Sequence, residues 1–217
     1  MAAGAYRKPI DGLAGMSKKI PCVSYTPRLR VSDILFTRTM TKIKLYIATS
    51  LDGFIAREDG SLDWLDALPN PNQIDHGYAD FLKTIDTVIM GKSTYEKILS
   101  FGVDWPYATC HSYILTTDKD FRAKTAKTQV INQINPSMIE QVKAASKKDI
   151  WIVGGGITIT HFINLGLIDE MILCLLPTIL GKGIRLFPNN PKETLLSPIK
   201  SELFETGAVM VTYERKK

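Results

Sequence analysis

The chain has 217 residues, 45% hydrophobic and 23% charged, an ordinary globular composition with room for one large domain or two small ones. No apolar run approaches the ~20 residues of a membrane-spanning helix, so we expect no membrane partner. Three unclustered cysteines without a Cys-x-x-Cys pair argue against a disulfide framework or a metal site and favour a reducing, cytoplasmic location.

The net charge of +5 belongs to one end of the chain. Residues 1–39 contain seven basic and two acidic residues, whereas the remainder contains 20 of each. The neutral remainder gives no reason to expect a nucleic-acid partner. Residues 1–39 lack periodicity and end before an internal methionine, Met40, so we expect a disordered extension or a start assigned too early. Residues 40–217 are then a single domain.

Strand and helix patterns alternate along this domain. A strand over residues 43–48 leads into a long irregular connection, residues 49–72, of a length typical of lids and binding loops. Trp64 lies in this connection, where it either covers a ligand or seals the sheet edge. Asp75 is expected to cap a helix whose apolar stripe extends to Ile85.

Two of the following strands end in polar turns. A strand over residues 87–90 runs into Gly91-Lys92-Ser93-Thr94, which opens a helix. This resembles the end of a Walker A loop, but Asp86 occupies the place of its first glycine and excludes a P-loop. A strand over residues 112–115 ends at Thr116-Thr117. Ligands bind at the carboxyl ends of parallel strands, so both turns are candidate phosphate contacts.

A run of three glycines is the most informative feature. In residues 149–162 an apolar run stops at Gly154-Gly155-Gly156 and a second apolar segment follows, which predicts a buried strand, a tight turn and a helix. Such a turn lets phosphate groups approach backbone N–H groups at the positive end of the helix. A turn without a ligand is the simpler alternative, but it needs fewer glycines. Ile159 replaces the last glycine of the dinucleotide fingerprint, so that motif is absent.

The remaining elements complete an α/β pattern. Asn135 and Pro136 begin a helix, a strand covers residues 168–176, and residues 203–213 form a terminal hairpin around Thr206-Gly207. The order predicts a three-layer αβα fold with a mainly parallel central sheet and an antiparallel C-terminal hairpin.

Several chemistries lack support. There is no Gly-x-Ser-x-Gly elbow or His-Glu-x-x-His motif, and His76, His111 and His161 are scattered. The three glycine-rich or polar strand ends instead favour a long, multiply phosphorylated ligand.

At this point the motifs resemble the dihydrofolate-reductase-like superfamily, in particular its branch with the reductase domain of riboflavin biosynthesis. The resemblance rests on residues 45–53, 88–96, 152–162, Asp169-Glu170 and 177–187. It implies a stand-alone, homodimeric, NADPH-dependent reductase similar to 5-amino-6-(5-phosphoribosylamino)uracil reductase. The implied substrate is a small heterocycle (pteridine or aminopyrimidine-like) or a carbonyl or imine compound.

The resemblance also implies positions around the cofactor. Ala48 would offer its backbone to the nicotinamide carboxamide, and the glycines, with a cis Gly-Gly bond, would lie against the pyrophosphate. Lys92, Ser93 and Thr94 would hold the phosphates. Thr116 and Thr117 would lie around the adenosine 2′-phosphate, with Lys92 as a further candidate there. Trp64 would close over the nicotinamide, with Tyr46 and Tyr78 at the substrate. The expected cofactor-binding residues are Ala48, Gly91, Lys92, Ser93, Thr94, Thr116, Thr117, Val153, Gly154, Gly155, Gly156, Ile157 and Thr158.

Some positions depart from the family pattern. Ile157 replaces the basic residue that often follows the glycines. Val153 and Tyr46 replace a glutamate and a lysine of the riboflavin reductases, which argues against their substrate. No acid aligns with the substrate-protonating carboxylate, so Asp52 and Asp75 are the catalytic candidates, although Asp75 is equally suited to capping a helix. The missing acid leaves a second hypothesis, a non-catalytic dinucleotide-binding module that kept the cofactor cleft.

Overall fold

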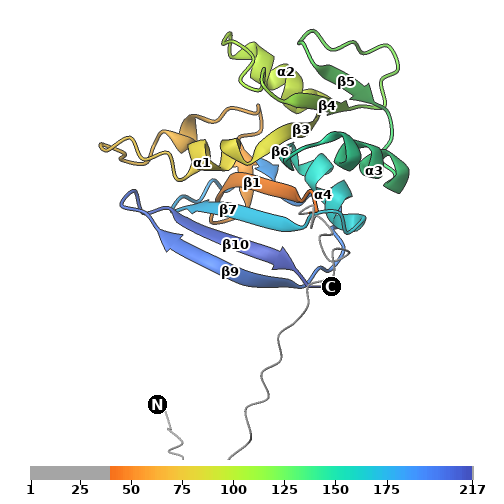
Figure 1. The fold of residues 1–217 in the computed structure, drawn as a ribbon. Coiled ribbons are helices and arrows are strands. Elements are labelled where there is room, and N and C mark those ends of the chain that lie inside the picture. Colours follow the sequence, from red (N-terminus) through yellow and green to blue (C-terminus); the bar gives the residue numbers. More distant parts are fainter. Residues whose placement is uncertain (1–39, 217) are drawn as a thin grey trace, which may run out of the picture. The chain divides into compact units, whose positions relative to one another are not determined.

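An eight-stranded sheet forms the centre of the computed structural model (Figure 1), which describes residues 40–216. The prediction made for residues 1–39 concerns residues outside this range. The strand order is β5-β4-β3-β6-β1-β7-β10-β9, in which β10 is antiparallel to both of its neighbours and all other pairs are parallel. A separate two-stranded sheet pairs β2 with β8. The strands are β1 Ile43–Ser50, β2 Phe54–Ala56, β3 Ile85–Gly91, β4 His111–Leu115, β5 Thr128–Ile131, β6 Asp149–Gly154, β7 Glu170–Leu176, β8 Ile184–Arg185, β9 Leu196–Leu203 and β10 Val209–Arg215.

Helices cover both faces of the sheet. The helices are α1 Tyr78–Lys83, α2 Lys92–Ser100, α3 Pro136–Ala145 and α4 Gly156–Asn164, with a 3-10 turn at Asp63–Leu65. One core joins α3 and α4 to β1, β3 and β6, and a second joins α1 and α2 to the opposite face. The predicted three-layer αβα fold is therefore confirmed. No helix within residues 40–216 is long and apolar enough to cross a membrane.

Local sequence explains most element boundaries. The Asn135 side chain accepts a hydrogen bond from the N–H of Met138 at 2.9 Å, so this residue caps α3 as predicted. The prediction for α1 was too long, because Thr84 ends the helix and Ile85 begins β3. The terminal hairpin was predicted too short, since β9 begins at Leu196; polar residues exposed on this edge strand hide its alternation.

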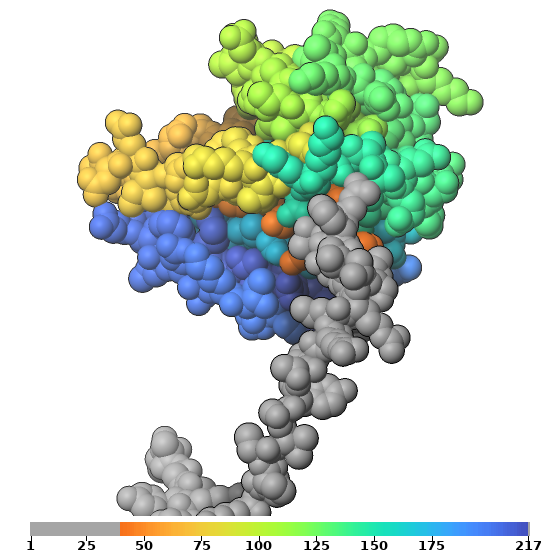
Figure 2. All heavy atoms as spheres, viewed as in Figure 1, coloured from red at the N-terminus to blue at the C-terminus, as the bar shows by residue number. Residues whose placement is uncertain are grey.

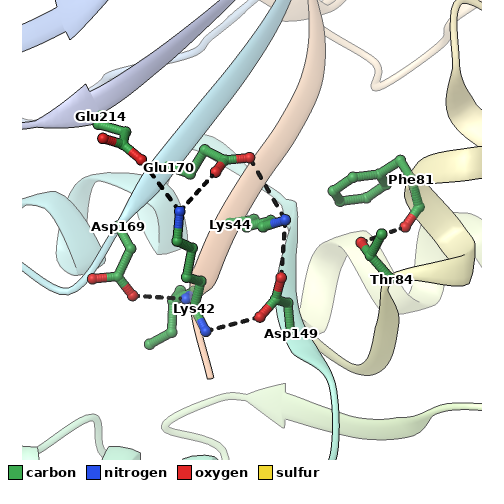
Figure 3. A network of polar contacts seen from close by, with 9 residues as sticks. Lys42, Lys44, Phe81, Thr84, Asp149, Asp169, Glu170 and Glu214 are labelled. Carbon is green, nitrogen blue, oxygen red and sulfur yellow. Dashed lines mark hydrogen bonds and ion pairs between the residues drawn. The ribbon is translucent and has the colours of Figure 1, made fainter. Parts of the chain in front are cut away.

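A network of charged side chains joins the amino-terminal ends of the parallel strands (Figure 3). Its members are Lys42, Lys44, Asp149, Asp169, Glu170 and Glu214. Lys44 Nζ lies 2.9 Å from Asp149 Oδ2 on β6 and 3.6 Å from Glu170 Oε1 on β7. The N–H of Lys42 donates to Asp149 Oδ1, and that of Ile43 donates to Asp169 Oδ2. These contacts fasten β1 to both neighbours at one end.

We predict that Lys44→Met destabilises the protein more than Lys200→Met. The Lys44 side chain is only 13% exposed, and its removal leaves the carboxylate of Asp149 without its cation and Glu170 paired with Lys42 alone. The expected loss in free energy of unfolding is about 1–3 kcal/mol. Lys200 is 69% exposed in its pair with Glu202, so its loss should cost less than about 1 kcal/mol. Urea unfolding measures both, and equal losses would contradict a structural role for the network.

Candidate functional site

The central sheet opens between β1 and β6. β1 pairs with β7 from Lys44 to Ser50, but its pairing with β6 ends at Leu45, opposite Ile152. The carbonyl of Tyr46, the next residue on the β6 side, accepts from the Trp151 indole N–H at 3.1 Å. Because successive strand residues alternate in direction, the backbone of Ala48 faces the same side beyond the last pair. The predicted carboxamide contact therefore lies at an opening in the sheet.

The turns at residues 91–94 and 154–156, both predicted to bind phosphate, lie next to each other at this edge of the sheet. Thr94 Oγ1 accepts a hydrogen bond from the N–H of Gly155 at 2.9 Å. A Cβ added at Gly91 would lie 3.0 Å from Thr158 Oγ1. Helices α2 and α4 both begin here, and neither has a side-chain cap on its amino terminus. Two uncapped helix termini together offer N–H donors to an anion.

The three glycines meet different physical requirements. Gly154 has a φ of 144°, a conformation that disfavours any side chain. A Cβ on Gly155 would approach Thr94 Oγ1 at 3.2 Å, and a Cβ on Gly156 would collide with the carbonyl oxygen of Arg185 and with Pro188. Gly156 is therefore needed for packing. The expected cis Gly-Gly bond is wrong, since all peptide bonds within residues 40–216 are trans.

A cavity of about 510 Å³ lies beyond the glycine turn. It brings together Thr116, Thr117, Ile157 and Thr158, four of the predicted cofactor-binding residues. Sequence reasoning missed other lining residues, because Asn132, Gln133 and His161 carry no motif of their own. Leu115, Ile131, Ile134 and Leu165 supply an apolar wall. This combination of an apolar wall and polar groups suits a nucleoside.

The other predicted cofactor residues lie around the same edge. Lys92 Nζ forms an ion pair with Asp118 Oδ2 at 2.7 Å, which holds the lysine pKa above its usual value. Ser93 is exposed in the first turn of α2. Val153 is half-buried and packs on the α1–α2 side of the sheet. Lys92 and Ser93 therefore lie where a phosphate could reach them, whereas Val153 contributes packing.

Both candidate catalytic acids are occupied by hydrogen bonds. Asp52 accepts from Ser50 Oγ at 2.6 Å and from the N–H groups of Leu180 and Gly181 at 3.1 and 2.7 Å. These bonds, that of Ser50 foremost, lower its pKa to about 2. It fastens residues 180–181 to the end of β1, and it is ionised at neutral pH. The contacts of Asp52 are those of an anchor, and its expected catalytic role stays a prediction.

Asp75 stabilises the start of α1 from two residues before the N-cap, Gly77. Its carboxylate accepts from the N–H of Ala79 and of Gly77, both at 2.9 Å, and these two bonds lower its pKa. Because it is exposed and ionised, it does not fit the requirement of a general acid, whose pKa should be near the working pH.

An aromatic cluster fills the sheet face below α1. The Tyr46 ring stacks on Phe81 with centroids 4.5 Å apart, and both rings contact Trp151 edge-on. Tyr78 lies 6.0 Å from Tyr46. A second cavity, of about 470 Å³, begins at Tyr46 and lies between α1 and the outer strands β9 and β10, yellow and blue in Figure 2. The predicted substrate residues Tyr46 and Tyr78 thus share one face with Ala48.

Trp64 packs in the interior. It is 2% exposed in a cluster with Cys174, Leu176 and Ala208, and Ala48 packs against this cluster. The packing supports the sealing alternative, and closure over a nicotinamide stays a prediction.

The geometry agrees with comparisons to known proteins. The family model described as "RibD C-terminal domain" matches residues 41–210. The chain belongs to this family. Family members are NADPH-dependent reductases with a dihydrofolate-reductase-like fold.

Three similar proteins illustrate the relationship. The uncharacterized YwjB of Bacillus subtilis (strain 168) is 41% identical over 155 residues, 71% of this chain and 87% of the relative. A structure from Shewanella sp. PV-4, assigned provisionally to riboflavin biosynthesis, is 33% identical with a TM-score of 0.75 and covers 82% of this chain and 100% of its own. Dihydrofolate reductase from Enterococcus faecalis, in complex with NADP(H), shares the fold at 19% identity, with a TM-score of 0.56 and coverage of 82% and 98%.

The residues present fit the cofactor of the family. The opening beside Ala48, the turn at residues 154–156 and the 510 Å³ cavity follow one sheet edge, in the order in which the nicotinamide, pyrophosphate and adenosine would be held. The uncapped α2 and α4 termini supply N–H donors between them.

We predict that Gly156→Ala costs more stability than Gly155→Ala. The new methyl group at 156 meets backbone and proline atoms that cannot move freely, and the expected loss in free energy of unfolding is about 1–3 kcal/mol. At 155 it meets only the Thr94 hydroxyl, and the expected loss is less than about 1 kcal/mol. Guanidinium unfolding measures both. A Gly156→Ala variant as stable as wild type would show that this glycine is not a packing requirement.

Proposed function

We propose that the protein is a stand-alone reductase that uses NADPH to reduce a small heterocyclic, carbonyl or imine substrate. The observation that carries this proposal is the opening between β1 and β6. There the backbone of Ala48 points toward β6 but has no partner on that strand, and the Ala48 side chain lies on the same sheet face as Tyr46. Substrates considered first are pteridine-like and aminopyrimidine-like rings, because flat heterocycles stack on aromatic side chains.

Each part of the site has a distinct task in this proposal. Ala48 would orient the nicotinamide, the N–H groups at the start of α2 and α4 would bind the pyrophosphate, and Thr116 and Thr117 would contact the adenosine end. NADPH, when bound, supplies the hydride. The protein would fix the distance between donor and acceptor atoms and limit water around them.

Neither of the two candidate catalytic acids, Asp52 and Asp75, is suited to donate a proton to the substrate. The carboxylates of Asp52 and Asp75 already accept hydrogen bonds from backbone N–H groups. Burial raises the pKa of Tyr46 and of Tyr78, so both phenols stay protonated. The Tyr46 hydroxyl already donates to the carbonyl of His76 at 3.1 Å. Water would then provide the proton to the reduced substrate, with the neutral Tyr78 hydroxyl as a hydrogen-bond donor.

The same observation supports a second candidate function. A module that binds a dinucleotide without reducing a substrate would need the sheet opening and glycine turn but no acid. Because neither Asp52 nor Asp75 is poised to give up a proton, this alternative is tested beside the first.

We predict that NADPH stabilises the purified protein and that Gly155→Asp abolishes the effect. At a concentration 100 times the dissociation constant, a ligand adds about 2.7 kcal/mol of stability, a rise in melting temperature of roughly 5–10 °C. An aspartate at 155 places a negative charge beside Thr94, where the pyrophosphate would lie. Gly102→Asp adds the same charge at the far end of α2, where nothing lies within 4 Å. Its φ of 68° strains a side chain and lowers the melting temperature of the free variant, but the rise on adding NADPH should be normal.

Substrate turnover separates the two candidate functions. NADPH oxidation at 340 nm is followed with pteridines, aminopyrimidine ribosides and simple carbonyl compounds, each compared with buffer. Oxidation with any of them supports the reductase. Binding without oxidation favours the module. Absence of a thermal shift with wild type would end both proposals.

We also propose a homodimer, formed through the outer strands. Leu203, Val209 and Leu175 lie in one row across β9, β10 and β7, and none of them is fully buried; Leu203 is 74% exposed. Val211 extends this apolar face along β10. A second copy of the chain would bury this surface against its own equivalent, as expected for a two-fold interface.

We predict a solution mass of twice the 24.2 kDa of the chain. Size-exclusion chromatography with light scattering measures it. Leu203→Asp should shift the population to monomer, because a charge would be buried in the interface. Lys200→Asp, on the opposite face of β9, is the control and should leave the mass unchanged. A monomeric wild type would refute the proposal.

A further inference from the structure

The lysine that opens α2 is already paired. Lys92 Nζ lies 2.7 Å from Asp118 Oδ2 and 3.8 Å from Glu96 Oε1. One positive charge therefore has two carboxylates around it. The Lys92 and Asp118 side chains are 32% and 41% exposed, so a cofactor could reach both. The family resemblance makes this lysine, beside Thr116 and Thr117, a candidate contact of the 2′-phosphate of NADPH.

Asp118 is held in place by more than the lysine. Its N–H donates to Thr116 Oγ1 at 3.1 Å, and its Oδ1 accepts from the N–H of Asp120 at 3.0 Å. The residue follows Thr116 and Thr117 directly, and these two line the 510 Å³ cavity. Asp118 is thus held next to two lining residues of the cavity expected for the adenosine, without lining it itself. Its backbone contacts would keep it there if Lys92 turned toward a phosphate.

A fixed carboxylate affects whether adenosine with a 2′-phosphate or adenosine with a free 2′-hydroxyl binds better. A phosphate monoester carries about −1.5 to −2 charges at neutral pH. It requires a cation, and it is repelled by a carboxylate at short range. A free ribose 2′-hydroxyl, in contrast, donates a hydrogen bond to a carboxylate, the arrangement that dinucleotide folds use to select NADH. Lys92 favours the phosphate and Asp118 favours the hydroxyl.

We propose that Asp118 is a specificity-determining residue that neutralises Lys92 and lets the protein accept NADH nearly as well as NADPH. The inference rests on the proposed function and refines it: the cofactor site is the same, but its discrimination at the 2′ position is weak. NADPH would bind by drawing Lys92 away from Asp118, and NADH by donating its 2′-hydroxyl to Asp118.

The test is direct binding by isothermal titration calorimetry, with NADPH and NADH and with the fragments 2′,5′-ADP and 5′-ADP. Wild type should bind NADPH and NADH with dissociation constants within about tenfold of each other. Asp118→Asn keeps the shape of the side chain and removes its charge, so the preference for NADPH should rise about tenfold or more. Lys92→Met should weaken NADPH and 2′,5′-ADP by a larger factor than NADH and 5′-ADP, because only the first two carry the 2′-phosphate.

Glu96→Gln is the matched control. It removes the same charge from the same lysine, at 3.8 Å instead of 2.7 Å and away from the strand ends. It should change the NADPH to NADH ratio by less than about threefold. The melting temperature of each variant without cofactor verifies that folding is unchanged.

Two failures are distinguishable. If wild type binds none of the four compounds, the proposed function is wrong and this inference falls with it. If wild type binds dinucleotides but prefers NADPH by more than about 100-fold, or if Asp118→Asn leaves the ratio within about twofold, the role of Asp118 is refuted and the proposed function stands.

Discussion

Unequal hydrogen bonding of β1 to its two neighbours is the constraint on which the site depends. β1 is paired with β7 as far as Ser50 but with β6 only as far as Leu45. The charged network at the amino-terminal ends holds the three strands together where they start. With that end closed, the strands can separate at the other end without loss of register. The opening beside Ala48 therefore begins at a position set by the strand register, next to the glycine turn that ends β6.

The glycine turn serves packing as much as binding. Gly154 permits the backbone to leave the strand at a φ of 144°, and Gly156 allows the segment with Arg185 and Pro188 to pack against the start of α4. Only Gly155, held by the Thr94 hydroxyl, faces the neighbouring turn. The sequence suggested that the three glycines serve only to let an anion approach the backbone, but each glycine is also required by its own backbone conformation or packing contact. The amino termini of α2 and α4 meet because these causes act together.

Periodicity and turn chemistry predicted much of this molecule. The strand, turn and helix at residues 149–162, the capped helix at Asn135 and the order of layers all follow from local patterns, which carry most of the information on secondary structure. Residues at the strand ends also came together as predicted, because parallel strands share a carboxyl edge. Contacts between distant segments could not be predicted in this way. The bonds of Asp52 to residues 180–181 and the β2–β8 pair span more than 120 residues.

The occupied acids bear on the choice of substrate. In a site that protonates its substrate through a carboxylic acid, the acid must keep a proton near neutral pH, which requires burial or a neighbouring negative charge. Asp52 and Asp75 have the opposite environment, since backbone N–H groups stabilise their ionised forms. The neutral phenols on the aromatic face are better hydrogen-bond donors than acids. A substrate whose acceptor atom is already electrophilic, or is activated by hydrogen bonding alone, suits this face better than one that must first be protonated.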